Sequence, residues 1–206
     1  MLLPETRRAQ LLDAESAGKS IDILAFWGHR PAPGGSIGSG CLSQWWPGQF
    51  TVEGVTYPTA EHWMMAGKAR LFGDPAGLTA VLAAASPGAA KAAGRLVRGF
   101  DEERWRSARY ELVVAGNLAK FSQNQVLNDF LRRTGRKVLV EASPFDRIWG
   151  VGMAASNPAV QKASTWRGLN LLGFALMDVR DHLRTDQPHT DHLRADHLRT
   201  HREKPR

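Results

Sequence analysis

Two charged side chains, Glu61 and Lys68, lie in a stretch of mostly apolar and small residues, TAEHWMMAGKARLFG, at positions 59–73. They are seven positions apart, so a helix would place both on one face, about two turns from each other. A helix that is apolar nearly all round is buried, and a buried carboxylate or amine is costly unless it is paired or used. The pattern therefore predicts one of two arrangements. Either the two side chains form a structural ion pair, or the helix lines an active site, in which a lysine with a lowered pKa could act as a nucleophile.

A second group of candidate site residues follows an apolar run in VEASPFDRIWG, residues 140–150. Glu141 lies near the end of a predicted strand, and Asp146 lies in the loop after it, three residues before Trp149 and Gly150. Carboxylates on a loop that a rigid element positions are common in catalytic sites. A carboxylate beside an aromatic face and a glycine suits a flat heterocycle attached to a sugar.

Aromatic residues flank the loop at 29–40, which is rich in glycine and proline. Phe26-Trp27 precede it and Trp45-Trp46 follow it, so some of these rings could stack on a base. Ser43 is a candidate hydrogen-bond donor to a ligand. The sequence has no GxSxG, GxGxxG or Walker motif, and no cluster of metal ligands outside the histidine-rich tail.

The elements that must position these residues are mostly helical. Helices are expected near the N-terminus, over 60–72, after Asp74-Pro75, Ser86-Pro87 and Asp101, over 123–135 and over 170–183. Strand patterns occur at 21–27 and 137–142, and 50–59 is typical of a hairpin. The predicted fold class is α+β, a helix-rich single domain with a small β-hairpin or sheet.

Composition separates the chain into three parts: a partly helical extension at 1–20, a domain at 21–184 and a low-complexity tail at 185–206. The formal charge is +7, of which residues 181–206, with six Lys/Arg and five Asp/Glu, contribute +1. The remaining +6 points to an anionic partner or serves solubility alone. The tail repeats DHLR, which favours disorder over a metal site. With no apolar run of membrane length, no signal peptide and one cysteine, we expect a cytoplasmic protein without a membrane partner.

Several motifs together resemble one known family. They are FW, LSQWWP, G-x-x-Y-x-T-x-EHWMMAGKARLF, AK-x-x-GR, N-x-AKF-x-QN, LVEASP-x-D-x-x-WG-x-G and LNLLGFALM-x-VR. In this order and spacing they resemble the NADAR family, also called YbiA-like, over about residues 21–184. The resemblance implies a YbiA-like fold and an N-glycosidase that uses no metal and no cofactor.

The resemblance also assigns roles to residues. It implies that Lys68, Glu61 and Asp146 are catalytic, and that Ser43, His62, Trp149, Gly150 and Asn170 bind the substrate. The residue patterns described above add Trp27, Trp45 and Glu141 as candidate substrate-binding residues. Asp146 or Glu61 would protonate the leaving base or stabilise positive charge at the ribose carbon. Lys68 would form a Schiff base with ribose C1 or bind phosphate instead, and Arg95 and Lys120 are further candidate phosphate contacts. The sequence departs from many members at Ser43-Gln44-Trp45 and at Met65-Ala66-Gly67.

Three functions are compatible with these implications. The first is hydrolysis of the base–ribose bond in aminopyrimidine ribose phosphates of riboflavin biosynthesis. The second is removal of ADP-ribose from guanine bases of nucleic acid, which the basic domain mildly favours. The third is a non-catalytic module that binds NAD or ADP-ribose. A small-molecule ribose phosphate is therefore the expected partner, and ADP-ribosylated nucleic acid is the alternative.

Overall fold

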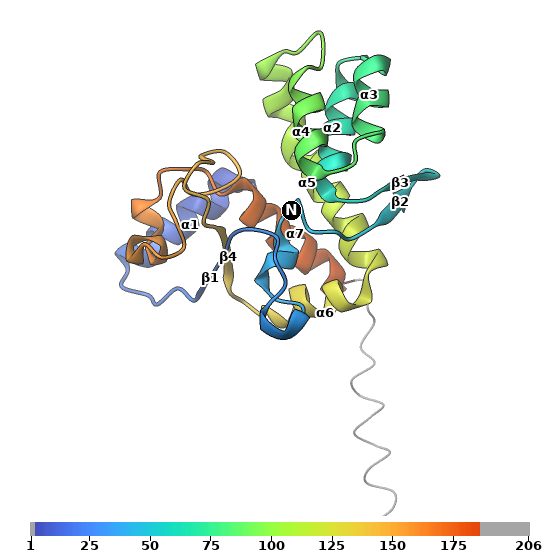
Figure 1. The fold of residues 1–206 in the computed structure, drawn as a ribbon. Coiled ribbons are helices and arrows are strands. Elements are labelled where there is room, and N and C mark those ends of the chain that lie inside the picture. The colour runs from blue at the N-terminus through green and yellow to red at the C-terminus, as the bar shows by residue number, and fades with distance from the viewer. Residues whose placement is uncertain (1–2, 186–206) are drawn as a thin grey trace, which may run out of the picture.

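The computed structural model describes residues 3–185, and Figure 1 shows how their elements are arranged. Helices dominate the described chain, which confirms the predicted helix-rich α+β class. The helices are α1 (Pro4–Ser16), α2 (Ala60–Leu71), α3 (Pro75–Leu82), α4 (Pro87–Arg95), α5 (Glu102–Gln123), α6 (Gln125–Arg133) and α7 (Leu171–Thr185).

In the described part of the chain, four short strands form two separate two-stranded sheets. β2 (Phe50–Val52) and β3 (Val55–Tyr57) pair antiparallel, which confirms the predicted hairpin. β1 (Ile23–Phe26) pairs in parallel with β4 (Val138–Glu141), and Phe26 lies opposite Glu141 at the last position of the pairing. Both strands of a parallel pair end at the same edge. The loop after β1 and the loop after β4 therefore leave the small sheet at one end, on which the candidate site is built.

Side-chain caps begin four of the helices at the positions that the sequence predicts. Each capping oxygen accepts a hydrogen bond from a backbone N–H in the first turn, which satisfies a donor that has no partner inside the helix. The pairs are Thr59 with His62, Asp74 with Gly77, Ser86 with Ala89 and Asp101 with Arg104. The cap at Thr59 fixes where α2 starts and so places Glu61 in its first turn.

Two helices organise the core. α7 packs against both α5 and β4, and its Leu172, Phe174 and Leu176 are fully buried. α2 is covered by α3, α4 and α5, as the upper part of Figure 1 shows. Burial on several sides is what the apolar composition of residues 59–73 predicts, and it leaves one end of α2 to meet the loops of the small sheet.

The last described helix, α7, extends to the end of the described residues. α7 includes the first DHLR at 181–184 and also Thr185, the first residue of the predicted tail at 185–206. The rest of that tail, with the later copies of DHLR, lies outside the described residues. None of the helices in the described part of the chain combines the length and apolar character needed to cross a membrane.

Candidate active site

The candidate catalytic side chains surround one cavity of about 510 Å³, here called the inner cavity. It lies between α2, α4, the start of α5 and the loops that follow β1 and β4. Its lining includes Ser43, Trp45, Glu61, Lys68, Lys91, Arg95, Glu102, Trp105, Glu141, Asp146 and Trp149. The three parts of the sequence that were predicted to carry site residues, around 43–45, 61–68 and 141–149, therefore meet in one place, together with residues of α4 and the start of α5.

A larger hollow of about 1310 Å³, here called the outer groove, adjoins the inner cavity. The two share seven lining residues: Ser43, Trp45, Lys91, Arg95, Glu141, Asp146 and Ile148. Trp27 and Phe145 line the outer groove and are 60% and 89% exposed. Arg30 and Arg147 add positive charge to it. Glu141 and Asp146 thus lie at the junction of a confined space and a wide, basic one, whereas Glu61 lines the confined space alone.

Glu61 and Lys68 do not form the structural ion pair that was one interpretation of their spacing. Lys68 Nζ donates a hydrogen bond to the Gly94 carbonyl at 2.9 Å and lies 4.2 Å from the centre of the Phe100 ring. Glu61 Oε1 is buried and has no hydrogen-bond partner among the described residues. Both side chains line the inner cavity, so both are available to a ligand there.

Burial raises the pKa of Glu61 from its ordinary 4.5 to about 7. The nearby Lys91, a hydrogen bond from the Trp45 side chain and Arg95 act against this shift, while the charge of Asp146 adds to it. Burial also lowers the pKa of Lys68, and Glu102 opposes that change. Burial in the confined site therefore shifts the pKa values of the carboxyl group and the amine in opposite directions, and each shift favours the neutral form of the group.

Burial likewise raises the pKa of Glu141, the last residue of β4, to about 8. The charges of Asp146 and Glu61 contribute to this rise, and Lys91 acts in the opposite sense. Glu141 Oε2 is buried without a hydrogen-bond partner among the described residues. A carboxyl group that keeps its proton near neutral pH and has an unused oxygen can serve as a general acid.

Asp146 is held by the loop that carries it. Its Oδ1 accepts hydrogen bonds from the backbone N–H groups of Ile148 at 2.8 Å and Trp149 at 2.7 Å. Its own N–H donates to Ser143 Oγ at 3.2 Å. Both bonds to the carboxylate use Oδ1, so Oδ2 can face a ligand while the side chain stays oriented.

Gly150 and Asn170 support the site from behind and do not line either cavity. A Cβ on Gly150 would lie 2.7 Å from the Glu141 carbonyl oxygen, so only glycine fits between β4 and the loop. Asn170 is fully buried with a left-handed φ of 56°. Its amide group accepts from the Glu141 N–H at 3.0 Å and donates to the Leu139 carbonyl at 2.9 Å. Asn170 therefore orients Glu141 rather than lining the space for substrate.

His62 and Lys120 also lie away from the cavity lining. The two ring nitrogens of His62 are within hydrogen-bond distance of Thr59 Oγ1, at 2.8 Å, and the Ala84 carbonyl, at 3.1 Å. Lys120 is fully buried, and its Nζ donates to the carbonyls of Cys41 and Ser43 at 2.8 and 2.9 Å. The prediction that Lys120 contacts phosphate is wrong, because the amine is enclosed and holds the loop that carries Ser43.

Lys91 is the main site residue that sequence reasoning missed. It lines both hollows and acts on the pKa values of Glu61 and Glu141. Arg95, a predicted phosphate contact, lines both hollows as well. The two cations are four positions apart on α4, which places them on one helix face, and this spacing was the available signal.

Comparisons with known proteins find a family model, several relatives and a solved structure that match this chain. Residues 25–184 match the family model of the NADAR domain. The chain is 40% identical over 145 residues to N-glycosidase R617 of Acanthamoeba polyphaga mimivirus, covering 68% of this chain and 85% of the viral protein. It also resembles the NMR structure of the E. coli protein YbiA, with a TM-score of 0.64, 27% identity and coverage of 82% of this chain and 90% of that one.

A third relative is a plant protein that is named for a pathway. The chain is 33% identical over 135 residues to the chloroplastic riboflavin biosynthesis protein PYRR of Zea mays. The match covers 62% of this chain but 20% of the maize protein. The similarity therefore concerns one part of a much longer relative.

Proposed function

The chain belongs to the NADAR family, and from this premise and the geometry of the inner cavity we propose that it hydrolyses the base–ribose bond of aminopyrimidine ribose phosphates. The observation that carries the proposal is the group of three carboxyl side chains, Glu61, Glu141 and Asp146, around one confined space. Two of them have pKa values raised to about 7 and about 8, which suits proton donation at neutral pH. A module that only binds nucleotides has no evident need for buried acids of this kind.

Glu141 is the proposed acid for the departing base. The C1–N bond breaks as its electron pair moves to the base nitrogen, which takes the proton from the Glu141 carboxyl group. Positive charge then develops at the ribose C1 and ring oxygen, as in other glycoside cleavages. Asp146 is the proposed carboxylate that stabilises this charge, because two backbone N–H groups fix one of its oxygens and hold the side chain in place beside the cavity.

Lys68 is the proposed nucleophile. Burial lowers the pKa of its amine, and a neutral amine can attack C1. The attack forms a C1–N bond and leaves a positive charge on the Lys68 nitrogen. The C1–O bond of the ring then breaks as the ring oxygen takes a proton from this nitrogen, which leaves a protonated imine. Water adds to C1, two of its protons pass to the nitrogen, and the C1–N bond breaks, so that the open-chain sugar leaves and the Lys68 amine is restored in its protonated form. Lys91 and Arg95 lie near the carboxylates and can bind the phosphate instead. Their presence leaves Lys68 free for the covalent role.

The outer groove favours a second candidate function, removal of ADP-ribose from guanine bases of nucleic acid. A monocyclic base on a single ribose phosphate does not need the further 1310 Å³ of the groove. Exposed Trp27 and Phe145 can stack on additional bases, and Arg30 and Arg147 can contact additional phosphates. Under this function Trp27→Ala should weaken turnover of an oligonucleotide substrate, while turnover of a small ribotide should be unchanged.

Two parallel incubations test the proposal. The protein is mixed with an aminopyrimidine ribose phosphate, and separately with a guanine-ADP-ribosylated oligonucleotide, and the release of ribose phosphate or ADP-ribose is followed by chromatography. Release from the ribotide alone supports the proposed function, and release from the oligonucleotide alone selects the second candidate. Binding without cleavage of either substrate would refute both enzymatic functions.

A further inference from the structure

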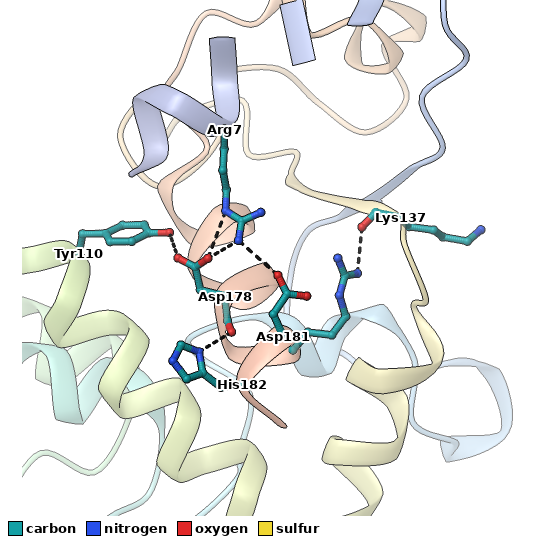
Figure 2. Close-up of polar contacts among 7 residues, drawn as sticks. Arg7, Tyr110, Lys137, Asp178, Asp181 and His182 are labelled. Carbon is teal, nitrogen blue, oxygen red and sulfur yellow. Dashed lines mark hydrogen bonds and ion pairs between the residues drawn. The ribbon is translucent and has the colours of Figure 1, made fainter. Parts of the chain in front are cut away.

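The N-terminal helix α1 lies outside residues 25–184, which match the family model, yet it is bonded firmly to the domain. Figure 2 shows Arg7 reaching from α1 to Asp178 on α7, with Tyr110 approaching the same carboxylate from α5. Arg7 Nε donates to Asp178 Oδ1 at 3.1 Å, and its Nη2 contacts both Asp178 and Asp181. The Tyr110 hydroxyl donates to Asp178 Oδ2 at 2.7 Å. These contacts fix α1 against two core helices.

Two other side chains of α1 hold a different part of the chain, residues 163–169, here called the support segment. The Glu15 carboxylate accepts hydrogen bonds from the backbone N–H groups of Ala163 and Ser164, the latter at 3.0 Å. Arg8 donates through its two terminal nitrogens to the carbonyls of Trp166 and Gly168, each at 3.2 Å. All of these bonds are charge-assisted, so they are stronger than ordinary bonds between neutral groups. The helix thus holds the support segment by hydrogen bonds near both of its ends.

The support segment is in turn joined by its backbone to the loop that carries Asp146. The N–H of Arg167 donates to the Val151 carbonyl at 3.0 Å, and the N–H of Leu169 donates to the Arg147 carbonyl at 2.9 Å. At Gly168 the two chains are so close that a Cβ would lie 2.3 Å from the Gly150 carbonyl oxygen. A shift of the support segment must therefore move the Asp146 loop.

We propose that α1, through Arg8 and Glu15, is a positioning element for the catalytic loop at residues 143–152. The inference rests on the proposed function, because that function gives Asp146 its role at C1. Neither side chain lines the inner cavity or the outer groove, so both act through the support segment and neither touches substrate. A small misplacement of a catalytic group has large effects on rate, so losing either contact should lower kcat by roughly tenfold and change KM much less.

A pH profile distinguishes positioning from a loss of fold. The charges that act on Glu141 are Asp146 from the loop, Glu61 from α2 and Lys91 from α4. The Asp146 charge helps to raise the pKa of Glu141, so a loop that moves away lets this pKa fall. In Arg8→Ala and Glu15→Ala the alkaline limb of the kcat profile should therefore move to lower pH. Partial unfolding alone would lower the amplitude without moving the limb.

Hydrogen exchange of the full chain without substrate tests directly whether α1 holds the catalytic loop in place. Peptides that cover residues 146–152 should exchange faster in Arg8→Ala and Glu15→Ala than in the wild type. The matched controls are Lys19→Ala and Asp13→Ala, a cation and an acid that are exposed near the same helix and should leave exchange unchanged. In Arg8→Lys the protection from exchange should be only partly retained, because one ammonium group does not reproduce the two hydrogen bonds of the guanidinium group.

The outcomes distinguish the positioning role of α1 from the proposed activity. Faster exchange together with a lower kcat and a shifted limb supports the inference. Unchanged exchange in both variants overturns it, and so does faster exchange with kcat and the pH profile unaltered. If the wild type cleaves no N-glycoside, the proposed function fails and the positioning role fails with it, whereas the exchange data still establish whether α1 holds the loop.

Discussion

Replacing Glu141 by glutamine should stabilise the protein at alkaline pH while it abolishes the proposed acid. The folded protein holds the Glu141 proton up to a pKa of about 8, against an ordinary 4.5, because burial and the charges of Asp146 and Glu61 oppose ionisation. The folded state thus binds this proton more tightly than the unfolded state. Stability is therefore lost as pH rises from the lower pKa to the higher one. Glutamine is neutral at every pH and does not carry this penalty.

The size of the effect follows from the two pKa values. A pKa difference of one corresponds to about 1.4 kcal/mol, so the difference between the folded and unfolded pKa values of Glu141 corresponds to at most about 5 kcal/mol of stability. Between about pH 5.5 and about pH 8.5 the difference in unfolding free energy, variant minus wild type, should rise by about 3 kcal/mol. Any constant cost of burying the amide group is the same at both pH values and cancels in this comparison.

Urea denaturation at the two pH values measures the difference directly, with the change in midpoint converted through a common m-value. The Glu111→Gln variant is a suitable control, because Glu111 is an exposed carboxylate on α5 outside the cavity lining. Its stability relative to the wild type should be nearly independent of pH. An equal effect of Glu141→Gln at both pH values would refute the reasoning, since Glu141 would then ionise normally in the folded protein.

Three further results are expected. Gly150→Ala should cost about 2 kcal/mol or more of stability and most of the activity, because its Cβ would overlap the Glu141 carbonyl, whereas Gly88→Ala should be tolerated; equal melting temperatures would contradict this. Asp146→Asn should lower kcat by about 100-fold or more with an unchanged circular dichroism spectrum, and a rate within about threefold of the wild type would remove its role. Arg95→Ala should raise KM for a phosphorylated substrate by about tenfold with little change in kcat, and an unchanged KM would exclude phosphate binding there.

Much of the local structure could be predicted because local patterns determine it. The cap at Thr59, the apolar composition of α2 and the hairpin formed by β2 and β3 are each encoded within a few residues, and each is present. The placement of Glu61 and Lys68 on one face of α2 follows from helical spacing alone. These predictions did not need any knowledge of distant contacts.

The remaining features depend on contacts between distant parts of the chain. The parallel pairing of Phe26 with Glu141 joins segments more than a hundred residues apart, and it decides which loops meet at the site. Lys120 is a cation of the type that often binds phosphate, but its partners in the fold are backbone carbonyls. Contacts to the backbone of a distant segment cannot be recognised in a sequence pattern. The support that α1 gives to residues 163–169 was hidden for the same reason, since Glu15 and Arg8 contact backbone atoms there.

The covalent role of Lys68 is the part of the mechanism that a single measurement tests most directly. Borohydride is added during turnover of the aminopyrimidine ribose phosphate, and the protein is analysed by intact mass and by peptide mapping. The wild type should gain one reduced ribose phosphate on the peptide that contains Lys68, and Lys68→Ala should gain none and release no base above the buffer control. Steady release of base by the wild type without any adduct, or an adduct that persists in Lys68→Ala, would contradict the mechanism.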